Sequence, residues 1–117
     1  MKRALLGLLI ALAACAPQNA NGLSVTLAPG RYGVGQRDVL LEVQQGGRPF
    51  ETRVLNIEGN MTHAGMGTVT ASAVSLGGGR YRISNFDFNM SGDWILTVSA
   101  VENGKTLTGE VRLSVSQ

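Results

Sequence analysis

The 117-residue chain contains a single cysteine, Cys15, and a single histidine, His63. One cysteine leaves no disulfide within the chain, so the folded part must be stable through its core alone. Protein zinc sites combine several cysteine or histidine ligands, and neither residue type has a second copy to accompany His63. The sequence therefore excludes a disulfide scaffold and argues against a zinc protein.

Clustered charge and abundant aromatic rings are also lacking. The chain has ten Lys and Arg against eight Asp and Glu, and no basic run is interleaved with aromatic residues, so nucleic acid is not an expected partner. The acidic residues are dispersed, and local spacing forces no pair of them together. Three Phe, two Tyr and one Trp are few enough that the core is expected to use most of them, which argues against a carbohydrate-binding platform.

The N-terminus has the pattern of a bacterial lipoprotein signal. Lys2 and Arg3 precede an uninterrupted apolar or small run from Ala4 to Ala14, which is too short to span a bilayer as a helix. The run ends in Leu-Ala-Ala-Cys at residues 12–15. In such signals a peptidase cuts before the cysteine, whose thiol carries a diacylglycerol. The sequence thus predicts a lipid anchor at Cys15.

This interpretation divides the chain into three parts. Residues 1–14 are the signal peptide, residues 15–22 are the lipidated cysteine and a flexible tether, and residues 23–117 are one domain. The mature protein is expected to be a membrane-anchored lipoprotein on the periplasmic or cell-surface side. Removal of the signal takes the ten basic residues to eight, equal to the eight acidic ones. With the only cysteine acylated and one histidine left, no nucleophile–base arrangement can form, and an enzyme is not expected.

Short β-rich runs separated by glycine-rich turns recur after the tether, without sustained helical periodicity. This pattern predicts an all-β fold, an immunoglobulin-like Greek-key β-sandwich of about seven strands. Tyr81 and Trp94, each at the start of a strand, are expected to plug one end of the core. The predicted strands are Leu23–Leu27, Asp38–Gln44, Arg53–Gly59, Thr68–Leu76, Tyr81–Phe86, Trp94–Val101 and Leu107–Val115.

Apart from the initiator, the methionines and the histidine fall in two short segments, Asn60–Gly67 and Asn89–Trp94. Thioether sulfur and imidazole are soft and borderline donors that favour copper, especially Cu(I), over hard cations. Glycines flank these residues and allow sharp turns. The candidate metal ligands are Met61, His63, Met66 and Met90.

Strand counting predicts where the two segments lie. The chain of a sandwich reverses at every turn, so connections separated by two strands emerge at the same end. The first segment follows the third predicted strand and the second follows the fifth. All four candidate ligands are therefore expected at one end of the domain, within reach of a single ion.

The alternative is that these methionines only fill the mouth of the sandwich, as flexible side chains commonly do. Phe86, Phe88 and Met90 share one strand parity, which favours a core position for Met90. The protein would then be a metal-free immunoglobulin-like envelope module that binds a protein partner through a sheet edge or loops.

Three stretches resemble the YtkA-like/FixH-like domain family. They are Met61-x-His63-x-x-Met66, Gly79-Arg80-Tyr81-Arg82, and the run from Phe88 to Val98 with its Met-x-Gly-x-Trp-x-Leu-x-Val pattern. The resemblance implies a small extracytoplasmic immunoglobulin-like fold. FixH-type members carry an N-terminal transmembrane helix, which the predicted lipid anchor replaces here.

Some relatives in that family are associated with copper handling or with supplying copper to terminal oxidases. The resemblance therefore implies Cu(I) as the bound metal and copper delivery to a respiratory oxidase as the function. Partners would be the membrane, through the lipid, and a copper chaperone or a cytochrome oxidase assembly component. Transferred residue by residue, Met61, His63, Met66 and Met90 are the implied ligands.

Overall fold

The computed structural model describes residues 22–62 and 67–117, and within those ranges it contains strands and no helix. No helix in this part of the chain is long and apolar enough to cross a membrane. Cys15, the predicted signal and most of the tether lie outside the described residues. The strands are β1 (Ser24–Leu27), β2 (Tyr32–Gly33), β3 (Gly35–Gln45), β4 (Arg48–Pro49), β5 (Val54–Met61), β6 (Val69–Gly77), β7 (Arg80–Phe88), β8 (Gly92–Glu102) and β9 (Lys105–Ser116).

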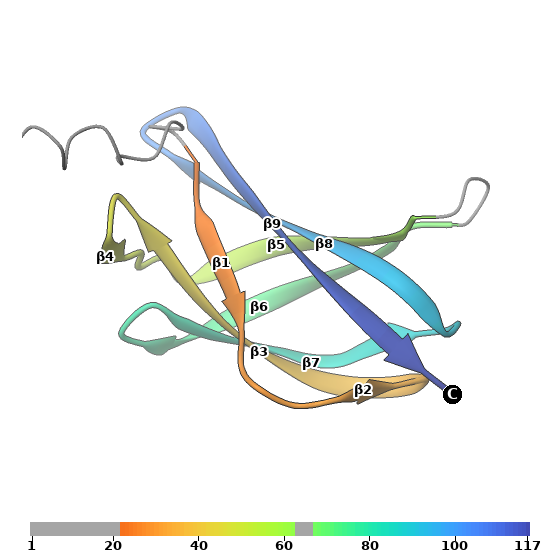
Figure 1. Ribbon diagram of the computed structural model, residues 1–117. Coiled ribbons are helices and arrows are strands. Elements are labelled where there is room, and N and C mark those ends of the chain that lie inside the picture. Colours follow the sequence, from red (N-terminus) through yellow and green to blue (C-terminus); the bar gives the residue numbers. More distant parts are fainter. Residues whose placement is uncertain (1–21, 63–66) are drawn as a thin grey trace, which may run out of the picture.

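The strands form one sheet that curls until its halves face each other (Figure 1). Their order is β1-β3-β7-β6-β5-β8-β9-β2, with β4 paired to β3. The first four make one layer, and β5, β8 and β9 make the other. This is the strand arrangement of an immunoglobulin constant-type domain. The predicted all-β immunoglobulin-like sandwich is confirmed; two extra strands, β2 and β4, have two residues each and gave no periodic signal.

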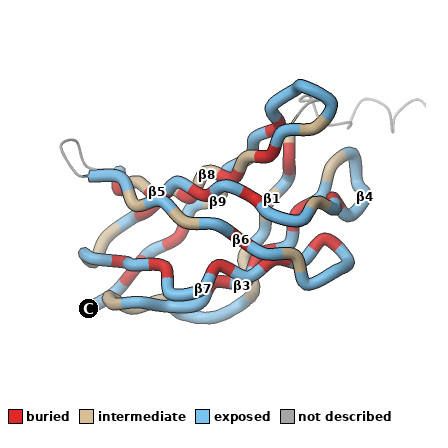
Figure 2. Tube along the Cα trace, turned by 180° about the vertical axis from the view of Figure 1, so that it is seen from behind, coloured by how far each residue is buried: buried red, intermediate tan, exposed pale blue. Residues whose placement is uncertain are grey.

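Alternation of apolar and polar residues sets which side chains enter the core. In β3, Val39, Leu41 and Val43 point inward and are fully or almost fully buried, while their neighbours are exposed. The same period of two runs along β5, β7, β8 and β9, as the tube in Figure 2 shows. Every buried core residue lies between Leu23 and Val115. The segment that follows the predicted tether therefore carries the whole described core.

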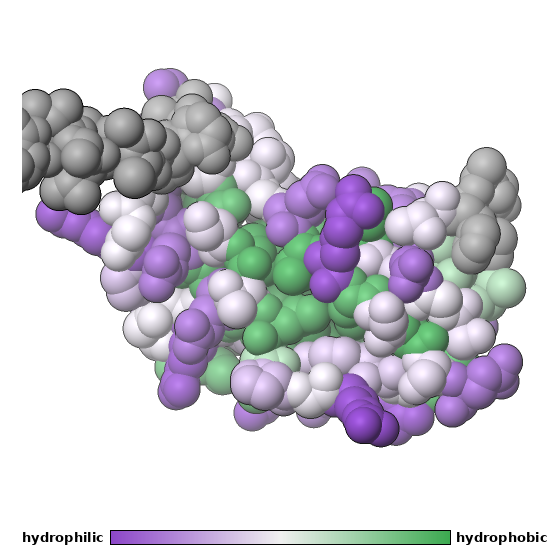
Figure 3. All heavy atoms as spheres, viewed as in Figure 1, coloured by the Kyte–Doolittle hydropathy of each residue, from purple (hydrophilic) through white to green (hydrophobic). Residues whose placement is uncertain are grey.

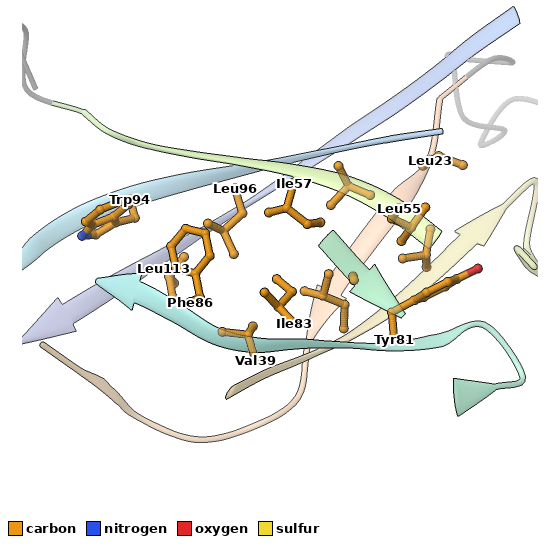
Figure 4. Packing of buried hydrophobic residues seen from close by; sticks show 14 of the residues in the cluster. Leu23, Val39, Leu55, Ile57, Tyr81, Ile83, Phe86, Trp94, Leu96 and Leu113 are labelled. Carbon is orange, nitrogen blue, oxygen red and sulfur yellow. The ribbon is translucent and has the colours of Figure 1, made fainter. Parts of the chain in front are cut away.

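Tyr81 and Trp94 occupy opposite ends of this core, so the expectation that they plug the same end is wrong (Figure 4). Consecutive antiparallel strands begin at opposite ends, and these residues lie near the starts of β7 and β8. The Tyr81 hydroxyl donates a hydrogen bond to the Phe50 carbonyl over 2.6 Å and accepts one from the Thr52 N–H over 2.9 Å. These two hydrogen bonds fix the chain between β4 and β5 to β7.

The two ends of the sandwich differ in what they carry. The tether end holds the beginning of β1 and the β8–β9 hairpin, where the Leu23 N–H donates to the Thr108 carbonyl over 2.8 Å. The methionine end is defined by two connections, β5–β6 (residues 62–68) and β7–β8 (residues 89–91). In Figure 1 the start of β1 and the β8–β9 hairpin lie on one side, and the end of β5 and the start of β6 lie on the other.

Candidate metal centre

The two connections of the methionine end are neighbours. β5 and β8 are antiparallel partners, and their last pair at this end is Met61 with Trp94. One residue further, the Thr62 N–H donates to the Asp93 carbonyl over 3.1 Å. The ladder thus continues into the start of the β5–β6 connection. The strand-count prediction that both connections emerge at one end is confirmed for the described residues.

Met61 belongs to the core. Leu55, Ile57, Gly59 and Met61 form the inward row of β5, and Met61 is 8% exposed. It is the last inward residue of the strand, so its side chain lies beneath the connections rather than in the middle of the sandwich. Its partner Trp94 is also buried. The Met61 side chain is therefore part of the hydrophobic core at the methionine end.

Met90 lies at the surface, with 45% of its area exposed. The parity that it shares with Phe86 and Phe88 had favoured a core position, and the structure overturns that expectation. The reason is that β7 ends at Phe88, so alternation no longer governs Met90. The Trp94 indole N–H donates to the Met90 carbonyl over 3.0 Å and holds the turn against the core.

His63 and Met66 lie outside the described residues, so two of the four predicted ligands have no structural account. The residues that flank them are exposed: Thr62 on one side and Gly67 on the other. At the base of this connection, the Thr68 hydroxyl donates to the Asn60 side-chain oxygen over 2.6 Å. This hydrogen bond joins the two strands from which the connection departs.

A rigid aromatic cluster supports the methionine end. Phe86 and Phe88 have ring centroids 4.8 Å apart, and the Trp94 ring meets both nearly edge-on, at 6.0 and 5.4 Å. Each edge-to-face pair at such a distance contributes about 0.5–1.5 kcal/mol of stability in addition to the contribution from its buried apolar area. Tyr32 extends the cluster, with its ring 5.9 Å from Phe88. The cluster fixes the ends of β7 and β8, and with them the Met90 turn.

The described residues hold no group of three or more His, Cys, Asp or Glu side chains close enough to bind a metal ion. The donors that this part of the chain brings to the methionine end are thioethers, one buried and one exposed. Asp93 is exposed nearby, but it accepts a hydrogen bond from the Ser114 hydroxyl over 2.9 Å. Thioether sulfur is a soft donor, of the type that favours Cu(I) over hard cations.

The chain was compared with curated proteins, solved structures and protein-family models. No curated protein and no solved structure matches it significantly. A family model described as YtkA-like matches residues 17–99, from the predicted tether to within β8. This range contains both connections of the methionine end and the aromatic cluster below them. Since the match covers more than half of the sequence, the chain belongs to the YtkA-like family.

Proposed function

We propose that this protein is a lipid-anchored, extracytoplasmic copper-binding protein that holds Cu(I) at the methionine end through Met61, His63, Met66 and Met90. The observation that carries the proposal is the exposed Met90 side chain. It sits on a turn fixed by Trp94, beside the strand end from which residues 63–66 depart. Core packing does not require a methionine at this position.

The chemistry of the donors favours transfer over storage. Thioethers and a neutral imidazole bind Cu(I) without the thiolates that make copper sites very tight. Because the imidazole must be neutral to bind, affinity should fall as the pH drops through the ordinary histidine pKa near 6.5. Such a site can take up and release copper, which suits a copper chaperone or a donor to an oxidase.

The start of β1 and the methionine end lie at opposite ends of the domain. β1 begins at the tether end, and β9 runs from there to the methionine end over 12 residues. At about 3.3 Å per residue, that strand spans roughly 40 Å. With Cys15 lipidated, the tether adds up to about 3.5 Å per residue. The methionine end would then face away from the bilayer, where a copper chaperone or cytochrome oxidase assembly component could reach it.

A Cu(I) competition titration tests the proposal, using the soluble chain from Ala16 and a chromophoric Cu(I) chelator. We expect one equivalent to be withdrawn from the chelator by the wild type, and withdrawal to fail for His63→Ala and Met66→Ala. Met90→Leu removes the sulfur but keeps an apolar side chain of similar size, and we expect weaker binding there too. Val101→Ala, at an exposed apolar position in β8 near the opposite end, is the matched control and should bind as the wild type does.

Met61→Leu separates the two roles of the buried thioether. Loss of Cu(I) affinity with unchanged thermal stability would assign Met61 as a ligand. Unchanged affinity would leave it as core packing and reduce the site to three ligands. If no variant and not even the wild type competes with the chelator, copper binding is wrong and the methionine end has another role.

A further inference from the structure

The outer face of the layer formed by β1, β3, β7 and β6 is apolar at its centre. Six large apolar side chains are exposed in the described residues, and four of them lie on this face or at its border with β5: Leu40, Val54, Val74 and Leu76. Between 42% and 56% of each side chain is exposed. On β9, in the other layer, the outward residues are Thr, Ser, Glu and Arg instead.

The strand register places these apolar side chains in one row. Arg82 of β7 pairs with Leu40 of β3 on one side and with Val74 of β6 on the other. Val74 in turn pairs with Val54 of β5, and Leu76 is the next outward residue of β6. An arginine stem covers apolar surface while its charged head stays in water. The row is therefore one continuous apolar patch across four strands.

A hollow of about 400 Å³ opens on the same face. It is lined by residues 26–29 at the end of β1, residues 40–42 of β3, Arg80 and Arg82 of β7, and Leu76 of β6. These strands lie in the order β1, β3, β7, β6. The hollow is therefore centred on the boundary between β3 and β7.

Apolar surface is also visible between β1 and β9 (Figure 3). There the two strands are joined, since the Leu23 N–H donates to the Thr108 carbonyl. The half-buried side chains of this region, Val25, Leu27 and Val111, pack against the core. This surface is the side of the core at which the two layers meet, whereas the outward residues of β3 and β7 are exposed.

Acidic and basic side chains face each other across the outer face. Glu42 of β3 is paired in register with Arg80 of β7. They do not form an ion pair, because the one ion pair among the described residues lies on β9. Further along the same two strands lie Asp38 and Arg82. Equal numbers of both signs do not select an anionic surface; they suit a partner with the same balance of charges.

The composition of the face is that of a protein–protein interface. Its cations are arginines, and Lys105, the one lysine among the described residues, lies on β9 at the tether end. Interfaces are enriched in arginine and depleted of lysine, and they have a polar rim around an apolar centre. Here the outward neighbours of the apolar row are Thr26, Ser72 and Ser84.

We propose that this face binds a second copy of the chain in a two-fold symmetric dimer. The axis lies parallel to the strands, above the boundary between β3 and β7. It sets β3 of one copy over β7 of the other, and β1 over β6. Glu42 then meets Arg80 of the partner subunit, and symmetry repeats this contact. Val74 and Leu76 lie over the end of the other copy's β1 and cover the hollow.

The size of the face is sufficient for a weak dimer. Four strands about 4.8 Å apart make it about 20 Å wide, and the nine residues of β7 make it about 30 Å long. Two such faces bury on the order of 1,200 Å² together, which is the lower limit for specific interfaces. We therefore expect association between about 10 μM and about 1 mM.

The direction of the axis keeps both copies in the same orientation. An axis parallel to the strands places the start of β1 of both copies at one end and both methionine ends at the other. With Cys15 lipidated, both tethers would reach the same bilayer. An axis across the strands would point the two tethers in opposite directions. The dimer does not depend on copper binding.

Sedimentation equilibrium of the chain from Ala16 tests the proposal. We expect a monomer–dimer equilibrium for the wild type over the concentrations given above. Leu76→Asp sets a charge in the apolar patch and should weaken the dimer at least tenfold. Val101→Asp is the matched control, because Val101 is 65% exposed on β8, outside this face. A wild type that stays monomeric at about 1 mM would overturn the proposal.

Charge reversals test the symmetry of the dimer. Glu42→Arg gives the central contact two cations, and Arg80→Glu gives it two anions. Each variant alone should associate at least tenfold more weakly, since symmetry makes every like-charge contact occur twice. Mixed in equal amounts, the two variants should form a heterodimer in which both contacts join opposite charges. No heterodimer, with both variants folded by far-ultraviolet circular dichroism, would contradict the proposed axis.

Two controls separate this contact from other effects. Glu110→Arg and Arg112→Glu on β9 change the net charge by the same amounts, and each alone should associate as the wild type does. The second control is sedimentation with vesicles of equimolar phosphatidylcholine and phosphatidylglycerol, which should leave the wild type in the supernatant. Binding of the wild type that is lost in Leu76→Asp would show that a bilayer covers the face, and the dimer would be wrong.

Discussion

Gly59 is the inward position of β5 at which a single methyl group should be most disruptive. In an open strand, Gly→Ala favours folding by about 0.4–1 kcal/mol, because alanine restricts the unfolded chain. At Gly59, however, the new Cβ would overlap the Phe86 ring and come within 3.1 Å of a Leu96 methyl group. The sign of the effect depends on whether the ring can move.

The Phe86 ring has no free direction to move in. It is 1% exposed, lies 4.8 Å from the Phe88 ring and meets the Trp94 ring edge-on. Overpacking of such a core costs about 1–3 kcal/mol. Alanine also restricts the unfolded chain, and this effect offsets part of the overpacking cost. The net expectation is that Gly59→Ala lowers the free energy of unfolding by about 1–2 kcal/mol. For a domain of this size that lowers the Tm by roughly 4–16 °C.

Thermal unfolding followed by Trp94 fluorescence measures this effect, since Trp94 is the only tryptophan and is buried. Gly67→Ala is the matched control: no atom of the described residues lies within 4 Å of a Cβ added at Gly67, and Gly67 does not have a positive φ, so the Tm of this variant should stay within a few degrees of the wild type. Phe86→Leu makes room for the methyl group and should recover about 1 kcal/mol in the double mutant relative to additivity. A Gly59→Ala variant as stable as the wild type would refute the packing argument.

Further predictions concern the two ends of the core. Tyr81→Phe removes both main-chain hydrogen bonds of the hydroxyl and should cost about 1–2 kcal/mol in urea unfolding at pH 7. Burial raises the pKa of the Tyr81 phenol and of Tyr32, so the contribution of these two groups to wild-type stability should be constant between about pH 8 and pH 10 and fall above pH 10, and less steeply in Tyr81→Phe; an equally steep fall would contradict this. Trp94→Phe removes the bond to the Met90 carbonyl and should destabilise by about 1–3 kcal/mol while weakening Cu(I) binding, measured by the chelator titration.

The fold could be predicted from the sequence because its signals are local and repeated. Alternation in β3 and β9, together with glycine-rich turns, identified the seven main strands in chain order. The two short strands were missed for a physical reason. β2 has two residues and exists because Tyr32 and Gly33 meet the end of β9, a contact between distant parts of the chain. Two residues are too few to show the alternation of apolar and polar side chains that identifies a strand.

The pairing of β1 could not be found in the same way. The inward residues of β9 alternate along the strand, and nothing local reveals that β1 pairs with β3 rather than with β9. A hint lies at Gly109, a glycine in the interior of a strand, which commonly marks a close approach of another backbone. That backbone is Leu23. Sequence alone does not say which segment approaches.

The two described methionines show where parity stops being informative. Met61 and Met90 each continue an apolar alternation, so parity alone places both in the core. Met61 keeps that place because the β5–β8 ladder extends to its pairing with Trp94. Met90 loses it because the β7 ladder ends at Phe88, where the aromatic cluster already closes the core. Core packing thus explains Met61 without a metal and leaves Met90 unexplained, so Met90→Leu is the substitution at which copper binding and packing predict different results.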